Sequence, residues 1–99
     1  MTFVVLAKWI AQPGQASSVA RAIANLVEPS RAEPGCRIYQ PHRDLDDRGV
    51  FLIYEQYADR AAYEAHCASE HFRRWATQQG IPLLEKRARG FYEPFDKIG

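Results

Sequence analysis

GVFLIYEQY, residues 49–57, is the clearest β-strand of the sequence, because β-branched and aromatic side chains follow one another along it. The polar run DLDDRG at residues 44–49 comes directly before it and is typical of a hairpin loop. On the other side of that loop, CRIYQPH at residues 36–42 has the composition of a second strand. These stretches together predict a β-hairpin.

A helix and a strand are expected after this hairpin. Asp59 is a suitable N-cap for a helix that runs from Arg60 towards Gly80. Pro82 interrupts the chain beyond that helix. Residues 87–95, RARGFYEPF, then predict the last strand, which is expected to be an edge strand or to end at its proline.

A strand and a helix are also expected before the hairpin. Residues 2–11, TFVVLAKWIA, have the apolar character of a strand that is buried on both faces, and the dipeptide Pro13–Gly14 predicts a turn. The apolar positions that follow fall on one stripe of a helix: Val19, Ile23, Leu26 and Val27. Pro29 is expected to end or kink that helix.

The predicted elements follow the order β-α-β-β-α-β. This order is typical of the ferredoxin-like α+β fold, an antiparallel four-stranded sheet with both helices on one face. Because 99 residues leave room for only one hydrophobic core, residues 1–99 are expected to form a single domain.

The uncovered face of such a sheet is expected to be apolar. Strands 2–11 and 49–57 both carry large apolar side chains on each of their faces, whereas the helices cover only one face of the sheet. The remaining face would exceed the few hundred Å² of apolar surface that a monomer tolerates. We therefore expect a homodimer in which two sheets pack face to face.

The composition gives no sign of a nucleic-acid or membrane partner. The 13 basic and 12 acidic residues leave a formal net charge of +1, which provides no basic surface for nucleic acid. No segment approaches the roughly 20 apolar residues of a membrane span. Cys36 and Cys67 have no paired spacing, so both are expected to be reduced and the protein to be cytoplasmic.

The stretch EAHCASEHF, residues 64–72, concentrates the side chains that are suited to chemistry. On a continuous helix, His66 and His71 would lie about 140° apart, which is too far for two ligands of one metal ion. Cys67 and His71 have the i, i+4 spacing of paired ligands, but further ligands have no recognisable spacing. No glycine-rich nucleotide or phosphate motif is present. We therefore expect neither a metal nor a cofactor.

Three stretches resemble the antibiotic biosynthesis monooxygenase family: AEPGC at 32–36, FLIYEQYAD at 51–59 and AAYEAHCASEHFRRW at 61–75. The resemblance covers nearly the whole chain and implies a small dimeric α/β barrel. Members of this family include quinol monooxygenases, enzymes that oxidise polyketide anthrones, haem-degrading oxygenases and a processing enzyme for a phosphorylated autoinducer. The first strand lacks the Asn that haem-degrading relatives use, so haem degradation is not expected.

The resemblance also implies a site. Ser69 is expected to act as the N-cap of a helix that restarts after a break at Ala68–Ser69. His66 and His71 could then both face the space between helix and sheet, where similar proteins have a cavity. We expect His71 to be the strongest catalytic determinant, with His66 and Glu55 as secondary catalytic residues.

Structural interpretations of the same residues remain open. His66 could face solvent beside Glu70, and His71 could be a partly buried histidine with a satisfied hydrogen bond. Glu55 could pair with an arginine across the dimer, because a lone buried charge is costly. Four aromatic residues could line a substrate pocket or only fill the core: Trp9, Tyr39, Phe72 and Trp75.

The resemblance favours a cofactor-independent monooxygenase that oxidises a small electron-rich aromatic, a quinol or polyketide phenol, with O₂. A deprotonated quinol can itself pass an electron to O₂, so the protein needs a base, a dry pocket and donors that hold the phenolate. The alternatives are an isomerase or other proton-transfer enzyme on the same scaffold, and a non-catalytic dimer that binds a small molecule. Only the monooxygenase should consume O₂.

Overall fold

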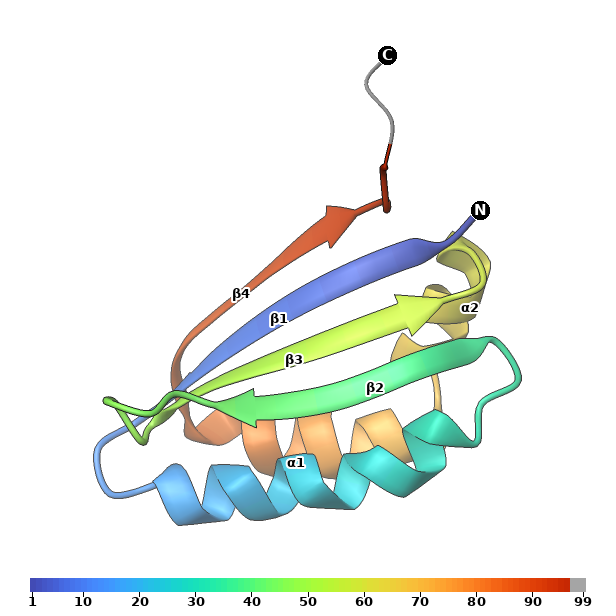
Figure 1. Ribbon diagram of the computed structural model, residues 1–99. Helices are drawn as coiled ribbons and strands as arrows, with labels where there is room; N and C mark the ends of the chain where they lie inside the picture. The colour runs from blue at the N-terminus through green and yellow to red at the C-terminus, as the bar shows by residue number, and fades with distance from the viewer. Residues whose placement is uncertain (97–99) are drawn as a thin grey trace.

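The chain forms the predicted order of strands and helices in a computed structural model that describes residues 1–96. The elements are β1 (Phe3–Ala11), α1 (Ala16–Arg31), β2 (Cys36–Arg43), β3 (Val50–Tyr57), α2 (Arg60–Cys67), the π-helix η1 (Phe72–Gly80), the 3₁₀-helix η2 (Ile81–Leu83) and β4 (Leu84–Tyr92). The strands pair antiparallel in one sheet of order β2-β3-β1-β4, and the helices lie on one face of it (Figure 1). The ferredoxin-like α+β fold is therefore confirmed, and within one chain the sheet is open rather than closed into a barrel.

Two boundaries differ from the prediction: the end of the first helix and the start of the last strand. Pro29 lies inside α1, which continues to Arg31, since a proline in the last turn removes only one backbone donor. The last strand begins at Leu84, directly after η2, and ends at Tyr92, before Pro94. The described part of the chain contains no helix that is long and apolar enough to cross a membrane.

The predicted helix from Arg60 towards Gly80 is interrupted after its second turn. The Asp59 carboxylate accepts from the Ala62 backbone N–H at 2.8 Å, which confirms Asp59 as the N-cap of α2. This helix ends at Cys67, and Ser69 then caps the restarted segment by accepting from the Phe72 backbone N–H at 3.2 Å. The interruption frees the residues on either side from the geometry of a single α-helix.

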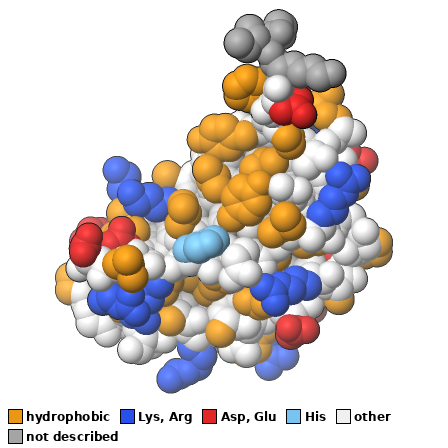
Figure 2. Space-filling view, viewed as in Figure 1, with side chains coloured by type: hydrophobic (Ala, Val, Ile, Leu, Met, Phe, Trp, Pro, Cys, Tyr) orange, Lys and Arg blue, Asp and Glu red, His pale blue; other side chains and the backbone are white. Residues whose placement is uncertain are grey.

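The two faces of the sheet carry different side chains. On the helix side, Trp9 of β1 lies opposite Phe51 of β3, and both are buried in the hydrophobic core. On the other side, Leu52 is 40% exposed, and Figure 2 shows hydrophobic side chains gathered over the strands. The single chain therefore buries one face of its sheet and leaves the other, partly apolar face uncovered, with Lys8 opposite Leu52.

Candidate active site

A small cavity lies between the helix side of the sheet and α2. Its volume is about 20 Å³, which is room for about one water molecule and far below the roughly 150 Å³ of a cavity that binds benzene. The lining residues come from all four strands, α2 and η1: Ala7, Trp9, Tyr39, Ile53, Glu55, Tyr63, His66, Phe72, Arg87 and Arg89. Most of the residues expected at the site from the sequence are therefore brought together here.

His66 is the most deeply buried titratable residue of this cavity, with 1% of its surface exposed. The centroid of its ring lies 5.5 Å from those of Tyr39 and Tyr57 and 5.3 Å from that of Phe72. The interpretation of His66 as a residue of a solvated helix face is therefore wrong. His66 lies three positions after the buried Tyr63 on α2, so both side chains are on the helix face that packs against the sheet.

Glu33 joins the two histidines. Its Oε2 atom lies 2.8 Å from His66 Nδ1 and 2.5 Å from His71 Nε2. The backbone N–H of Glu33 donates to the Ser30 carbonyl at 3.1 Å, which fixes the residue in the turn after α1. Among residues 1–96, its second oxygen, Oε1, is buried without a hydrogen-bond partner.

The carboxylate of Glu33 determines which nitrogen of His66 can accept a proton. An ionised carboxylate only accepts hydrogen bonds, so a neutral His66 ring carries its proton on Nδ1 and donates it to Glu33. The other nitrogen, Nε2, is then an unprotonated acceptor, and it lies 3.9 Å from Glu55 Oε1. A partly buried carboxylate thus orients a histidine whose free nitrogen faces a second carboxyl group.

Glu55 is 4% exposed, and its environment favours the neutral acid. Burial raises the pKa of Glu55, while the hydrogen bond from Tyr57 and the nearby His66 act in the opposite direction. The Tyr57 hydroxyl donates to Glu55 Oε1 at 2.5 Å. Burial, followed by the charge of Glu55, also raises the pKa of Tyr57, so this hydroxyl stays protonated. The hydrogen-bond partner of Glu55 is therefore a tyrosine of its own strand.

Two of the expected site residues lie away from the cavity lining. The side chain of His71 is 20% exposed and is linked to the cavity through Glu33. Trp75 instead lines a separate surface pocket with α1 residues such as Arg21. A π-helix has more residues per turn than an α-helix, so Phe72 and Trp75, three positions apart, diverge further than expected. Only Phe72 reaches the cavity.

Sequence reasoning missed Glu33 as a site residue. Its position lies 33 residues before His66 and 38 before His71, so no local spacing connects the three. The available signal was the string AEPGC, in which a carboxylate precedes the Pro-Gly turn into β2. That string contributed to the family resemblance, but no chemical role was predicted for its glutamate.

Glu33, His66 and His71 are also the described residues that could hold a metal ion. Their ligand atoms all lie within 4.8 Å of one another, and two histidines with one carboxylate can bind Zn²⁺ or Fe²⁺. Both histidine nitrogens, however, approach the same carboxylate oxygen at hydrogen-bond distance. The arrangement therefore fits two hydrogen bonds in which the histidines share protons with Glu33 Oε2. A metal ion would have to displace both of these protons.

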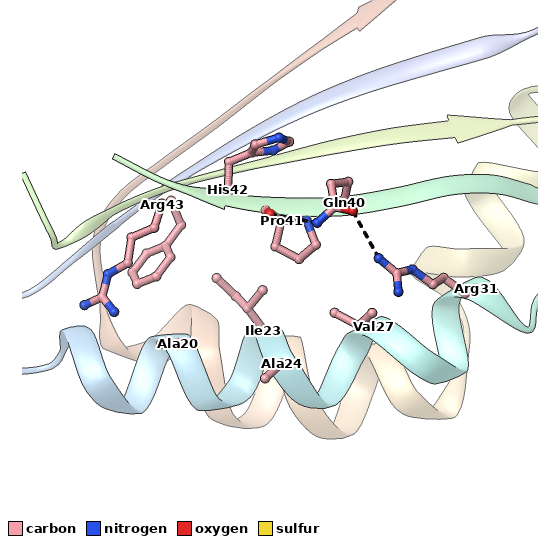
Figure 3. A pocket seen from close by; sticks show the side chains of 10 residues that line it. Ala20, Ile23, Ala24, Val27, Arg31, Gln40, Pro41, His42 and Arg43 are labelled. Atoms are coloured by element: carbon pink, nitrogen blue, oxygen red, sulfur yellow. Dashed lines mark hydrogen bonds between the residues drawn. The ribbon is translucent and has the colours of Figure 1, made fainter. Parts of the chain in front are cut away.

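A larger pocket of about 350 Å³ lies between α1 and β2 (Figure 3). Its wall is mainly apolar, and its Arg31 is engaged: Arg31 donates to the Tyr39 carbonyl at 3.1 Å and to Gln40 Oε1 at 3.3 Å. Figure 3 shows Pro41 on the α1 side of β2 and His42 on the opposite side. This pocket contains no carboxyl group to pair with a histidine, so the small cavity is the better candidate for acid–base chemistry.

Comparisons with known proteins agree with this fold. Residues 2–78 match the sequence model of the family described as antibiotic biosynthesis monooxygenase. PA3566 from Pseudomonas aeruginosa is 35% identical, with 96% of this chain and 95% of that chain covered and a TM-score of 0.91. Rv0793 from Mycobacterium tuberculosis is 28% identical over 100% of both chains, with a TM-score of 0.88. A solved structure described as an antibiotic biosynthesis monooxygenase is 29% identical, covers 95% and 99% of the two chains, and has a TM-score of 0.87. The chain belongs to the antibiotic biosynthesis monooxygenase family.

Proposed function

We propose that the protein is a cofactor-independent monooxygenase that oxidises a small electron-rich phenol or quinol with O₂. Membership in the family supports a monooxygenase-like function in general. The observation that carries the finer proposal is the buried His66, which Glu33 orients at Nδ1 and which offers Nε2 to the cavity. Such a histidine is a suitable base for a phenol proton.

The reaction balances without a cofactor. His66 Nε2 takes the phenol proton, and the phenolate passes one electron to O₂. The phenoxyl radical and superoxide then form a C–O bond at a ring carbon ortho or para to the oxygen. The resulting peroxide anion takes the proton back from His66 and becomes a hydroperoxide. The ring carbon then loses its hydrogen as a proton while the O–O bond breaks, and this proton joins the leaving hydroxide. One oxygen atom becomes a quinone carbonyl, and the other leaves as water.

His66 alone does not hold the phenolate. A phenol has a pKa of about 10 and a histidine about 6.5, so the proton transfer is uphill by roughly 5 kcal/mol. Donors that face the developing anion must supply the difference. Arg87 and Arg89 line the cavity, and Arg87 has no ion pair or side-chain hydrogen bond within residues 1–96. We assign the guanidinium group of Arg87 the main role in stabilising the phenolate.

The geometry supports a different order of importance for the two histidines than the sequence indicates. His71 contacts Glu33 but does not line the cavity, whereas His66 does both. We therefore propose His66 as the base, with Glu33 and His71 as positioning residues that hold its tautomer. Trp9, Tyr39 and Phe72 are proposed as the aromatic wall.

The functional unit is proposed to be a homodimer. The sheet face opposite the helices carries Leu6, Ile10, Leu52 and Tyr54. A second copy packed on this face would bury it and form the dimeric barrel that the family resemblance implies.

The proposal is tested with 1,4-dihydroxynaphthalene and ¹⁸O₂. We expect protein-dependent O₂ consumption and a hydroxynaphthoquinone that carries one ¹⁸O atom. His66→Gln should lower kcat by about 10²–10⁴-fold while its circular dichroism spectrum is retained. The control is Arg21→Gln, because Arg21 is exposed on α1 and lies outside both the cavity and the proposed interface. Equal turnover in both variants, or oxidation to a naphthoquinone without ¹⁸O, would contradict the proposal.

The close approach of Glu55 to His66 favours a second candidate, an isomerase or other proton-transfer enzyme. A carboxylic acid with a raised pKa and a histidine base 3.9 Å away can act as an acid–base pair. This activity would proceed in anaerobic buffer, in which a monooxygenase would be inactive because it lacks O₂. A protein that binds aromatics but turns over none of them under either condition would be the non-catalytic dimer.

A further inference from the structure

A surface pocket of about 390 Å³ lies between α2 and β4, next to the small cavity. The residues common to both linings are Tyr63 and Arg89. The pocket is large enough for a bicyclic aromatic molecule, whereas the cavity holds about one water. A ligand in the pocket would therefore stand directly in front of His66 and Glu55, separated from them by two side chains.

The partition between the two spaces is closed by a hydrogen bond. Arg89 Nη1 donates to the Tyr63 hydroxyl at 2.6 Å. Tyr63 is buried, and burial raises its pKa to about 12, so the hydroxyl remains neutral. Arg89 is exposed and keeps further N–H donors beyond the one that it gives to Tyr63. A ligand anion can therefore compete with a neutral oxygen for this guanidinium group.

The surroundings of the pocket combine cations with aromatic rings. The guanidinium of Arg60 lies 4.8 Å from the ring centroid of Phe3 and 5.2 Å from that of Phe91. Arg89 lies 5.3 Å from the Phe91 centroid. The acidic residue of the pocket lining is Glu64, which is exposed, so two cations face one carboxylate there. A planar ring with an anionic substituent matches both features.

We propose that the pocket between α2 and β4 binds an aromatic anion, and that Arg89 leaves Tyr63 to bind the anionic group and so opens the way to His66. The carboxylate or other anionic substituent pairs with Arg89, and the ring lies against the aromatic side chains. This inference deepens the proposed function, since it restricts the substrate to phenols that carry an acidic substituent. Only the statement that the bound anion is a substrate rests on the proposed function; the binding of aromatic anions does not depend on it.

The test uses two ligands that cannot be oxidised as phenols, 2-naphthoate and the neutral 2-naphthamide. Isothermal titration calorimetry should give an affinity about 10-fold higher for 2-naphthoate, as expected for one charge-assisted hydrogen bond. Arg89→Gln should abolish this preference, and Arg21→Gln, an exposed arginine on α1, should leave it unchanged. Equal affinities in the unchanged protein, or the same loss in both variants, would overturn the proposal.

Tyr63→Phe distinguishes a ligand-binding arginine from one that only packs on the surface. Without the hydroxyl, Arg89 loses its internal partner and is free for the anion. The variant should therefore bind 2-naphthoate at least as tightly as the unchanged protein and keep the preference over 2-naphthamide. Loss of that preference in Tyr63→Phe would overturn the gating by Arg89. Because neither ligand is turned over, these results stand whether or not the protein consumes O₂.

Discussion

At the scale of single residues, Glu33 determines the chemical character of the site. One carboxylate oxygen receives hydrogen bonds from His66 and His71, while the other is buried without a partner among the described residues. Buried carboxylates that keep an unpaired oxygen are costly, so such an arrangement is more easily explained by a role in chemistry than by stability.

If Glu33 orients His66, Glu33→Gln should lower kcat by about 10²-fold or more with little change in KM. The amide could present its NH₂ group to His66 Nδ1, which would favour the wrong tautomer of the ring. Steady-state kinetics with the quinol measure the two constants separately. Glu28→Gln, an exposed glutamate on α1, is the matched control. A rise in KM at unchanged kcat would assign Glu33 to binding instead.

If the cluster shares protons rather than a metal ion, activity should survive dialysis against EDTA. Elemental analysis of the purified protein should then find less than stoichiometric zinc, iron, manganese or copper. Loss of turnover on chelation, with recovery on addition of one of these ions, would instead make Glu33, His66 and His71 metal ligands.

Glu55 should make the protein less stable as the pH rises. Below the usual glutamate pKa of about 4.3, both the folded and unfolded states are protonated, and Glu55 contributes no pH dependence. Above it the unfolded chain releases the proton first, because burial raises the folded pKa, so stability falls until the pH passes that folded pKa. Glu55→Gln, whose oxygen can still accept from Tyr57, removes this loss.

The measurement is the difference in Tm between Glu55→Gln and the unchanged protein at about pH 4 and about pH 8. We expect the variant to gain stability relative to the unchanged protein between the two conditions. Glu64→Gln, an exposed substitution on α2, should show no such gain. A difference that is the same at both pH values would mean that Glu55 ionises as easily in the folded protein as in the unfolded chain.

At the scale of secondary-structure elements, the break between α2 and η1 positions the two histidines. Ser69 stabilises it twice, since its hydroxyl donates to the His66 carbonyl at 2.7 Å and accepts from the Phe72 N–H. Replacing it by alanine removes both bonds at once.

Ser69→Ala should destabilise the protein by about 1 kcal/mol, as typical for the loss of an N-cap. For a domain of this size that corresponds to a fall in Tm of roughly 4–8 °C, which calorimetry can measure. The kcat of the proposed oxidation should fall as well, because the positions of His66 and His71 relative to each other are no longer fixed. Ser17→Ala, exposed in the first turn of α1 and without a capping bond, is the control. An unchanged Tm would show that the break is held by other contacts.

The sequence predicted elements better than it predicted the site. Periodicity and turn residues located the strands and helices, because those signals act within a few positions. The apolar pattern did not predict the π-helix after His71. This π-helix moves Trp75 away from Phe72. Glu33 was missed because its partners lie in another part of the chain and meet it only in the folded molecule.

At the scale of the whole molecule, the uncovered face of the sheet predicts the oligomeric state. Leu52→Glu should halve the mass observed by sedimentation velocity at micromolar concentration, because it places a charge in the middle of the proposed interface. Leu45→Glu is the matched control, since Leu45 is 87% exposed in the loop between β2 and β3. A monomeric unchanged protein, or a dimer that tolerates Leu52→Glu, would contradict face-to-face packing.

The strand order leaves β2 and β4 at the two margins of the sheet (Figure 1). Pro41 in β2 has no N–H group to offer to a neighbouring chain, and β4 carries Lys86, Arg87 and Arg89 along its length. Prolines and charges at such positions prevent a foreign strand from extending a sheet. The fold can therefore keep an apolar surface for a second copy of the chain while its sheet margins disfavour the strand addition by which amyloid-like aggregates grow.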